Sequence, residues 1–250
     1  MPCPPSDEVR CRLAIVGTGL REGDMGQRVA QTLQECERLF CIEPLAAFAR
    51  RHPALAHKCQ SFDEVFDTLG HDRSAALRTI AARLIEVCAS LSRAAFVLGG
   101  HPCLGVTPVQ HLLALRPGWL AVETTPGVSS VDWLMADLGI DAADCGLQIV
   151  SGALCARLSP QLPAAIVSPG YAQSVALADR LAALARLTQD LMRCWGPEAR
   201  FLVYSRGEAA WQLDQLAVAD LVGLAMRPRL GETLLVGPLS LLPEHLQQAP

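Results

Sequence analysis

Apolar and polar positions follow one another in a regular succession along the first half of the chain. Short apolar runs at 13–17, 94–98 and 120–124 predict buried strands. The segment 71–93 predicts a helix, because its apolar residues recur three and four positions apart: Leu77, Ile80, Ala81, Leu84, Ile85, Cys88 and Leu91. We expect further helices over 25–39, after Thr107 and Pro108, which suit a helix start, and from near Ser129 to Gly139.

The same succession restarts in the second half of the chain. Apolar runs at 148–152, 164–170, 201–205 and 232–237 predict strands, and the amphipathic segment 172–195 predicts a long helix. Strands that alternate with helices indicate the α/β class with a largely parallel sheet. We expect a domain junction near 123–127, and therefore two domains, 1–123 and 124–250.

Composition narrows the class of protein further. The 250 residues are 51% hydrophobic and 18% charged, which excludes a disordered or fibrous chain. The net charge of −4 lacks the basic excess typical of nucleic-acid binding, so no nucleic-acid partner is expected. The longest uncharged stretch, 94–115, contains glycine, proline and histidine, and predicts no membrane span. The charged N-terminal segment 1–12 lacks the apolar core of a secretory signal, so we expect a cytoplasmic protein.

The ten cysteines predict neither a metal site nor a disulfide framework. No two are spaced as CxxC, and no histidine pair has zinc-finger spacing. Several occupy apolar positions of expected helices, where a free thiol packs as a small hydrophobic group. We therefore expect reduced, structural cysteines.

Three glycine-containing turns follow predicted strands, at 17–19, 99–105 and 125–130. Tight turns alone explain the glycines of any single loop. The dinucleotide-binding fingerprint GxGxxG fails because Glu22 stands at its last glycine, and no phosphate-binding GK[ST] loop occurs, since the only lysine is Lys58. Loops at the carboxyl ends of parallel strands nevertheless form ligand sites when several of them meet.

Taken together, the three loops resemble the tetrapyrrole methylase superfamily. The motifs are VGTG at 16–19, GHP at 100–102 and PGVSS at 126–130. The resemblance implies two αβα domains with a cleft between them for S-adenosylmethionine. The stretch 101–139, extended by ADLGID at 136–141, is similar to the borosin branch, whose members methylate backbone amide nitrogens of peptides. Weaker similarity continues to 243.

The resemblance implies a set of cofactor-binding residues. The main chain of Gly100, His101 and Pro102 would hold the cofactor, with Leu104 and Val106 as its apolar wall. Two serines, Ser129 and Ser130, would bind polar groups at a helix start. By their family position, three further residues would surround the adenosine: Ser168, Tyr204 and Thr233. The competing local explanations are that Ser129 only caps its helix and that His101 only bonds its own loop.

Arg73 is the candidate catalytic residue by the same resemblance. An amide nitrogen must lose its proton during methylation, and in the borosin branch an arginine and several tyrosines serve this step. Here Leu77, Gly99 and Phe66 stand where the phenols are expected, and the chain has only two tyrosines. The alternative for Arg73 is a solvated arginine on a helix face.

Three functions follow from this pattern. The first is a borosin-like methyltransferase that acts in trans on backbone amides of a separate precursor peptide. The second is a methyltransferase for a tetrapyrrole or other small-molecule acceptor, which the absent phenols favour. The third is a degenerate member that binds cofactor or peptide as a scaffold. The resemblance also implies a homodimer.

Overall fold

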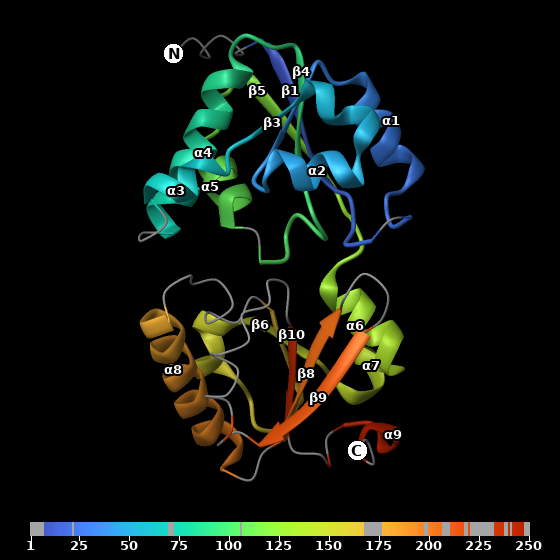
Figure 1. Cartoon of the computed structure of the whole chain (residues 1–250), viewed down its shortest axis with the longest axis vertical. Coiled ribbons are helices and arrows are strands. Elements are labelled where there is room, and N and C mark those ends of the chain that lie inside the picture. The colour runs from blue at the N-terminus through green and yellow to red at the C-terminus, as the bar shows by residue number, and fades with distance from the viewer. Residues whose placement is uncertain are drawn as a thin grey trace, which may run out of the picture. The chain divides into compact units, whose positions relative to one another are not determined.

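The computed structural model describes residues 8–21, 23–69, 73–105, 107–167, 177–197, 200–206, 211–217, 220, 233–237, 240 and 242–247. The chain divides into two compact units, Met1–Ser129 and Ser130–Pro250 (Figure 1). The boundary expected from the sequence, between 123 and 124, lies within a strand of the first unit, β5 (Leu120–Thr125).

The first unit contains a parallel sheet of five strands. These are β1 (Cys11–Gly17), β2 (Arg38–Cys41), β3 (Cys59–Ser61), β4 (Arg93–Leu98) and β5, in the order β3-β2-β4-β1-β5. Every neighbouring pair is parallel, so the carboxyl ends of all five strands lie along one edge of the sheet. This edge is where ligands bind in open α/β sheets.

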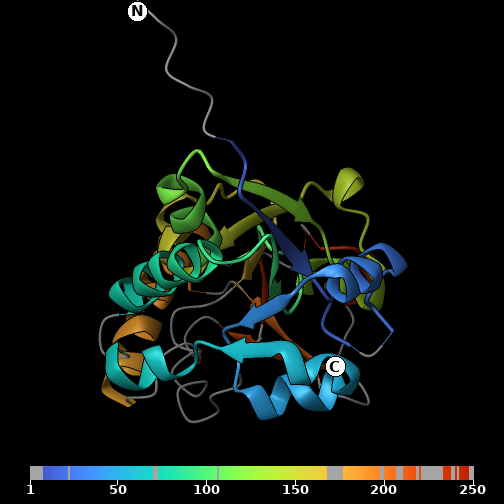
Figure 2. The ribbon, with the colours of Figure 1, turned by 90° about the horizontal axis from the view of Figure 1, so that it is seen from above.

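Helices cover both faces of this sheet (Figure 2). One face carries α1 (Gln27–Glu35) and α2 (Leu45–Arg51), whose buried Val29, Leu33 and Phe48 pack against Val16 and Leu39. The 3-10 helix η1 (Pro53–Lys58) follows α2. The opposite face carries α3 (Glu64–Leu69), α4 (Arg73–Cys88) and α5 (Thr107–Leu115). The apolar positions predicted for the helix over 71–93 are confirmed in α4, where Leu77, Ile80, Ala81, Leu84 and Cys88 are buried.

The helix expected over 25–39 is wrong at its end. The helix α1 stops at Glu35, and Arg38–Cys41 forms β2. Leu39 packs toward α1, whereas Phe40 packs on the opposite face and stacks on Phe62 with ring centroids 5.6 Å apart. Pairing with β4 on one side and β3 on the other stabilises this four-residue strand, and neither partner is visible in its local pattern.

The second unit has a mixed sheet in the order β6-β7-β10-β8-β9. Its strands are β6 (Gln148–Ser151), β7 (Ala164–Val167), β8 (Arg200–Arg206), β9 (Trp211–Ala217) and β10 (Thr233–Gly237). Only β6 and β7 pair in parallel, so the expectation of a largely parallel sheet is wrong for this unit. The strands β8 and β9 follow each other closely in sequence, and a short connection permits only antiparallel pairing.

Helices also pack on both faces of the second sheet. The long helix α8 (Leu177–Trp195) buries Leu184, Leu187 and Leu191 against Ile166 and Leu234. The opposite face meets α6 (Ser130–Leu138), whose Leu134 and Leu138 pack against Leu202 and Leu235. The shorter elements are α7 (Ala142–Cys145), η2 (Gly152–Arg157) and α9 (Glu244–Gln247). The α/β class is therefore confirmed. Among the described helices, none combines the length and the apolar character that a membrane crossing requires.

Candidate functional site

The topology of the first unit defines a switch point between β4 and β1. These two strands are neighbours, but the helix that follows β1 lies on one face of the sheet and the helix that follows β4 lies on the other. Loops that leave adjacent strands toward opposite faces open a crevice at the carboxyl ends of those strands. The loops concerned begin at Gly17 and Gly99, which the sequence pattern had singled out.

The three glycine loops touch each other through their backbones. The amide of Gly100 donates to the carbonyl of Gly19 at 2.8 Å, and the amide of Thr18 donates to the carbonyl of Leu98 at 2.9 Å. A Cβ atom on Gly17 would lie 2.2 Å from the Gly100 oxygen and 2.6 Å from the Gly127 nitrogen. The expected meeting of the three loops is therefore present, and its closeness excludes any side chain at Gly17.

Asp24 shapes the first of these loops and was missed in the sequence. Its Oδ2 accepts hydrogen bonds from the amides of Leu20 at 2.9 Å and Arg21 at 3.0 Å. Gly19 precedes this turn with a φ of +76°, a conformation that favours glycine. Because Asp24 already occupies these two amides, they do not form an anion site. The only local signal was an aspartate a few residues after a GxG turn.

His101 bonds its own loop, as the local explanation expects. Its Nδ1 accepts the amide hydrogen of Cys103 at 3.0 Å, and its carbonyl accepts the amide of Leu104 at 3.1 Å. A neutral imidazole whose Nδ1 accepts a hydrogen bond carries its proton on Nε2. The half-buried ring therefore keeps one N–H donor in addition to its structural bond.

The other predicted site residues of the second and third loops differ in their burial. Pro102 is buried, and its Cδ would lie 2.8 Å from a Cβ on Gly17. Leu104 is half-buried, and Val106 lies outside the described residues. Ser129 is buried directly before α6, the position of a helix cap, and Ser130 is the first residue of that helix.

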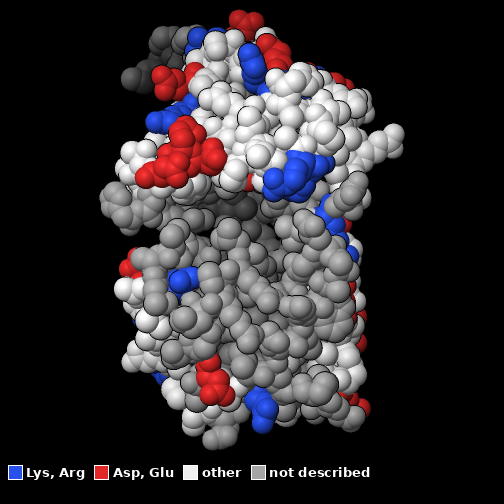
Figure 3. Space-filling view, viewed as in Figure 1, with Lys and Arg blue, Asp and Glu red and all other residues white. Residues whose placement is uncertain are grey.

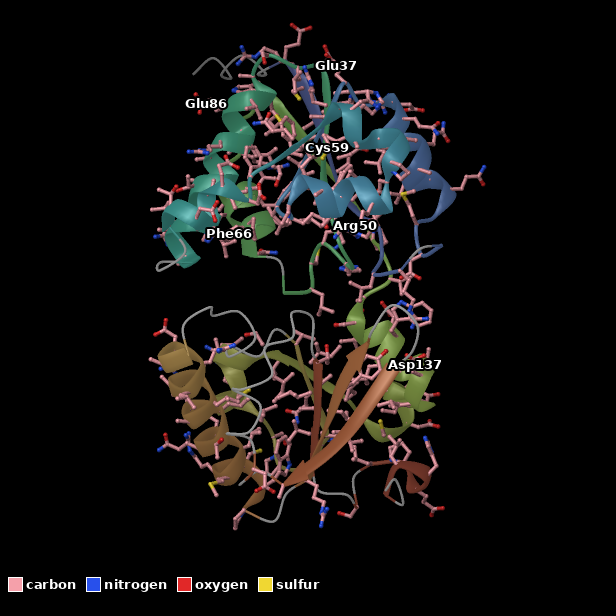
Figure 4. All side chains as sticks on the ribbon, viewed as in Figure 1. Glu37, Arg50, Cys59, Phe66, Glu86 and Asp137 are labelled. Atoms are coloured by element: carbon pink, nitrogen blue, oxygen red, sulfur yellow. The ribbon has the colours of Figure 1, made fainter. Side chains whose placement is uncertain are left out.

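In the second unit, Tyr204 and Thr233 are directly paired across β8 and β10. Both are buried, and the Tyr204 hydroxyl donates to Asp137 Oδ2 of α6 at 2.6 Å. Asp137 is labelled in Figure 4. These contacts give Tyr204 a structural role within the second unit, while its part in cofactor binding stays a prediction. Ser168, the third residue expected around the adenosine, lies outside the described residues.

The positions expected to supply phenols have other surroundings. Leu77 is buried in the core of the first unit, and Phe66 packs against the same cluster. Gly99 has no side chain and is exposed at the end of β4. Arg73 is the first residue of α4, and its side chain lies outside the described part of the structure.

Most of the described cysteines are buried or half-buried, as packing residues are, whereas Cys103 is exposed. All nine that the structure describes are free thiols. Burial raises the pKa of Cys155 to about 12, which keeps this thiol protonated. Within the described ranges, no three side chains of histidine, cysteine, aspartate or glutamate cluster closely enough to hold a metal ion.

Comparison with known proteins decides the family. The family model for Tetrapyrrole (Corrin/Porphyrin) Methylases matches residues 12–221. The chain belongs to the tetrapyrrole methylase family. The expected class, a family of methyltransferases that use S-adenosylmethionine, is thereby confirmed. None of the curated proteins matches this methylase.

Solved structures of other proteins share the fold of this methylase. The uroporphyrin-III-C-methyltransferase from Thermus thermophilus is 21% identical, with a TM-score of 0.63, and the match covers 94% of this chain and 100% of the other. A Thermus thermophilus uroporphyrin III C-methyl transferase complexed with S-adenosyl homocysteine is 16% identical, with a TM-score of 0.60 and coverage of 90% and 92%. A diphthine synthase is 14% identical, with a TM-score of 0.61 and 90% coverage of both chains. The expected tetrapyrrole methylase fold is therefore confirmed.

Proposed function

We propose that this methylase transfers a methyl group from S-adenosylmethionine to a small-molecule acceptor of the tetrapyrrole class. The observation that carries the proposal is the contact of the three glycine loops at the switch point between β4 and β1. The sequence of these loops is also the part that resembles the family.

The residues at this edge fit the cofactor. Gly99 is exposed and has no side chain, so a ligand can approach the main chain at this position. His101 adds an N–H donor, and Leu104 adds a half-buried apolar surface. When bound, S-adenosylmethionine supplies the electrophilic methyl group of its sulfonium. The chain itself must bind this group, orient the acceptor and exclude water.

The residues at the positions where the borosin branch has tyrosines favour a small-molecule acceptor over a peptide amide. Amide methylation requires removal of a proton and stabilisation of charge on oxygen. Leu77 packs in the core, Phe66 has no hydroxyl and Gly99 has no side chain, so none of the three supplies a donor. A carbon or amine nucleophile makes smaller demands on the protein.

A peptide acceptor is the second candidate function. The similarity of GHP, PGVSS and ADLGID to the borosin branch supports it, with Arg73 as the residue that assists proton removal and a separate precursor peptide as partner. A homodimer is proposed with either acceptor, on the basis of family resemblance alone. Neither candidate requires a metal ion or nucleic acid.

Two measurements test the proposal. Calorimetric titration with S-adenosylhomocysteine is expected to show binding, and its absence would overturn both enzymatic candidates. Incubation with S-adenosylmethionine and a panel of reduced uroporphyrinogens and short peptides, followed by mass spectrometry, is expected to add one methyl group or more to a tetrapyrrole. Methylation of peptides only would select the second candidate. Tight cofactor binding without turnover on the whole panel would favour the third function, a scaffold that binds the cofactor.

A further inference from the structure

An arginine reaches the open side of the GHP loop. Arg51 is the last residue of α2, and a Cβ built on Gly99 would lie 3.8 Å from its Nη1 and 3.9 Å from the Gly19 oxygen. Figure 4 labels the neighbouring Arg50 at this end of α2, and Figure 3 shows basic side chains over the same region of the first unit. A cation from the β2 connection therefore lies beside the start of the loop that follows β4.

Gly99 is not required by packing. Both distances from its hypothetical Cβ are ordinary van der Waals contacts, and its φ lies outside the positive range that favours glycine. Gly17 is the contrasting case, because a Cβ there would collide with backbone atoms. The fold therefore does not require glycine at position 99, where the missing side chain leaves space beside Arg51 Nη1.

An ion pair with Glu43 fixes the position of the Arg51 guanidinium. Its Nη2 donates to Glu43 Oε1 in an ion pair. The carbonyl of Glu43 in turn accepts from Ser61 Oγ at 2.5 Å and from Cys41 Sγ at 3.4 Å. These bonds attach Glu43 to the carboxyl ends of β2 and β3. A guanidinium that is already oriented loses less side-chain entropy when it binds a ligand.

The guanidinium keeps donors available. In the part of the chain that the structure describes, its only hydrogen bond is the one to Glu43, whereas the group has five N–H donors. Arg51 also acts as a net cation on its surroundings. The pKa of His52 is lowered mainly by burial, next by the charge of Arg51, and Glu43 opposes this only to a smaller extent.

We propose that Arg51 binds a carboxylate of a reactant beside Gly99. A guanidinium donates charge-assisted hydrogen bonds to carboxylates, and Nη1, the nitrogen near Gly99, makes no hydrogen bond within the described part of the chain. The inference rests on the proposed function, which supplies two sources of this group. They are the amino-acid end of the cofactor and the carboxylates of an acidic acceptor.

A structural alternative makes a different prediction. Cations in the last turn of a helix are favourable in their own right, and an ion pair of partly exposed groups contributes little to stability. If Arg51 serves only these purposes, its replacement changes the stability slightly and leaves ligand affinity unchanged.

The test compares Arg51→Gln with Arg50→Gln, which removes the same charge from the adjacent, exposed residue. Calorimetry measures the Kd of S-adenosylhomocysteine and of 5′-methylthioadenosine, which lacks the amino-acid end. Fluorescence titration measures the Kd of uroporphyrin III, a stable polycarboxylate. Circular dichroism verifies that both variants are folded.

Loss of a charge-assisted bond is expected to weaken binding about tenfold or more in Arg51→Gln, and less than about twofold in Arg50→Gln. If Arg51→Gln weakens the binding of S-adenosylhomocysteine but not of 5′-methylthioadenosine or uroporphyrin III, Arg51 binds the carboxylate of the cofactor. If it weakens only the binding of uroporphyrin III, Arg51 binds the acceptor. Unchanged binding of S-adenosylhomocysteine, together with unchanged or absent uroporphyrin binding, overturns the proposal. If the wild-type protein does not bind S-adenosylhomocysteine, the proposed function fails, and the uroporphyrin titration alone decides on Arg51.

Discussion

The Tyr204 hydroxyl donates to Asp137 Oδ2 at 2.6 Å and thereby joins β8 to α6 within the second unit. The Tyr204 ring is buried in the cluster formed by Leu134, Leu202 and Leu235. A distance of this length is typical of an O–H donor bound to a carboxylate.

Replacement of this hydroxyl tests its structural role. Tyr204→Phe is expected to lower the free energy of unfolding by about 1.5–3 kcal/mol, because the carboxylate of Asp137 loses a charge-assisted hydrogen bond. Urea denaturation followed by circular dichroism measures the change. Asp137→Asn keeps an acceptor oxygen and should lose less. A variant Tyr204→Phe with full stability but much weaker S-adenosylhomocysteine binding would instead place the hydroxyl in the cofactor site.

Gly17→Ala is expected to separate the three loops. The new Cβ would lie 2.2 Å from the Gly100 oxygen, so backbone atoms must move, at a cost of about 1–3 kcal/mol or more in unfolding free energy. Cofactor affinity should fall at the same time. The matched control is Gly26→Ala, where no atom lies within 4 Å of the added Cβ and φ is −66°. Equal stability of the two variants in urea would show that the loop contact is not important.

Two substitutions distinguish the two parts of the His101 ring. Asparagine places an acceptor oxygen near Nδ1 and can keep the bond from the Cys103 amide, but it removes the outer N–H. Glutamine offers an outer N–H and loses the local bond. We expect His101→Asn to remain as stable as the wild type and to bind S-adenosylhomocysteine about tenfold more weakly.

The reverse result would contradict this assignment. If His101→Gln loses stability and His101→Asn retains the full affinity in calorimetry, the ring serves only its own loop.

His52 makes the stability of the protein depend on pH. Its Nε2 is buried without a hydrogen-bond partner among the described residues, its ring packs on Phe48, and its pKa is lowered from 6.5 by burial and by Arg51. As the pH falls below about 6.5, the unfolded chain takes up the proton first, so the folded state loses stability until the pH passes the lower pKa of the folded protein.

Urea denaturation at several values between about pH 7.5 and about pH 5.5 measures this effect. His52→Gln is expected to lose less free energy of unfolding on acidification than the wild type. Because one group titrates, the unfolding constants of the two proteins should diverge by less than tenfold per pH unit. The control is His57→Gln, at an exposed histidine of η1, which should follow the wild type. Parallel curves for His52→Gln and the wild type would show that protonation of His52 is not coupled to folding.

Local patterns in the sequence were sufficient for the elements with strong periodicity. The apolar run 94–98 and the helical spacing of Leu77, Ile80 and Leu84 predicted β4 and α4, because burial on one or both faces dictates the residue type at each position. The strand β2 was missed because four residues next to a helix carry too little periodicity. Its strand conformation depends on β3 and β4, which are distant in sequence.

The glycine motifs and the family could be predicted from the amino-acid sequence, because close backbone contacts require glycine at particular positions of each loop. The tertiary structure decided which side chains meet around those loops. Arg51 reaches Gly99 only because the sheet order places β2 beside β4, and Tyr204 reaches Asp137 only because α6 packs on β8. Such contacts join segments whose local patterns carry no information about each other, and strand pairing is the physical step that brings them together.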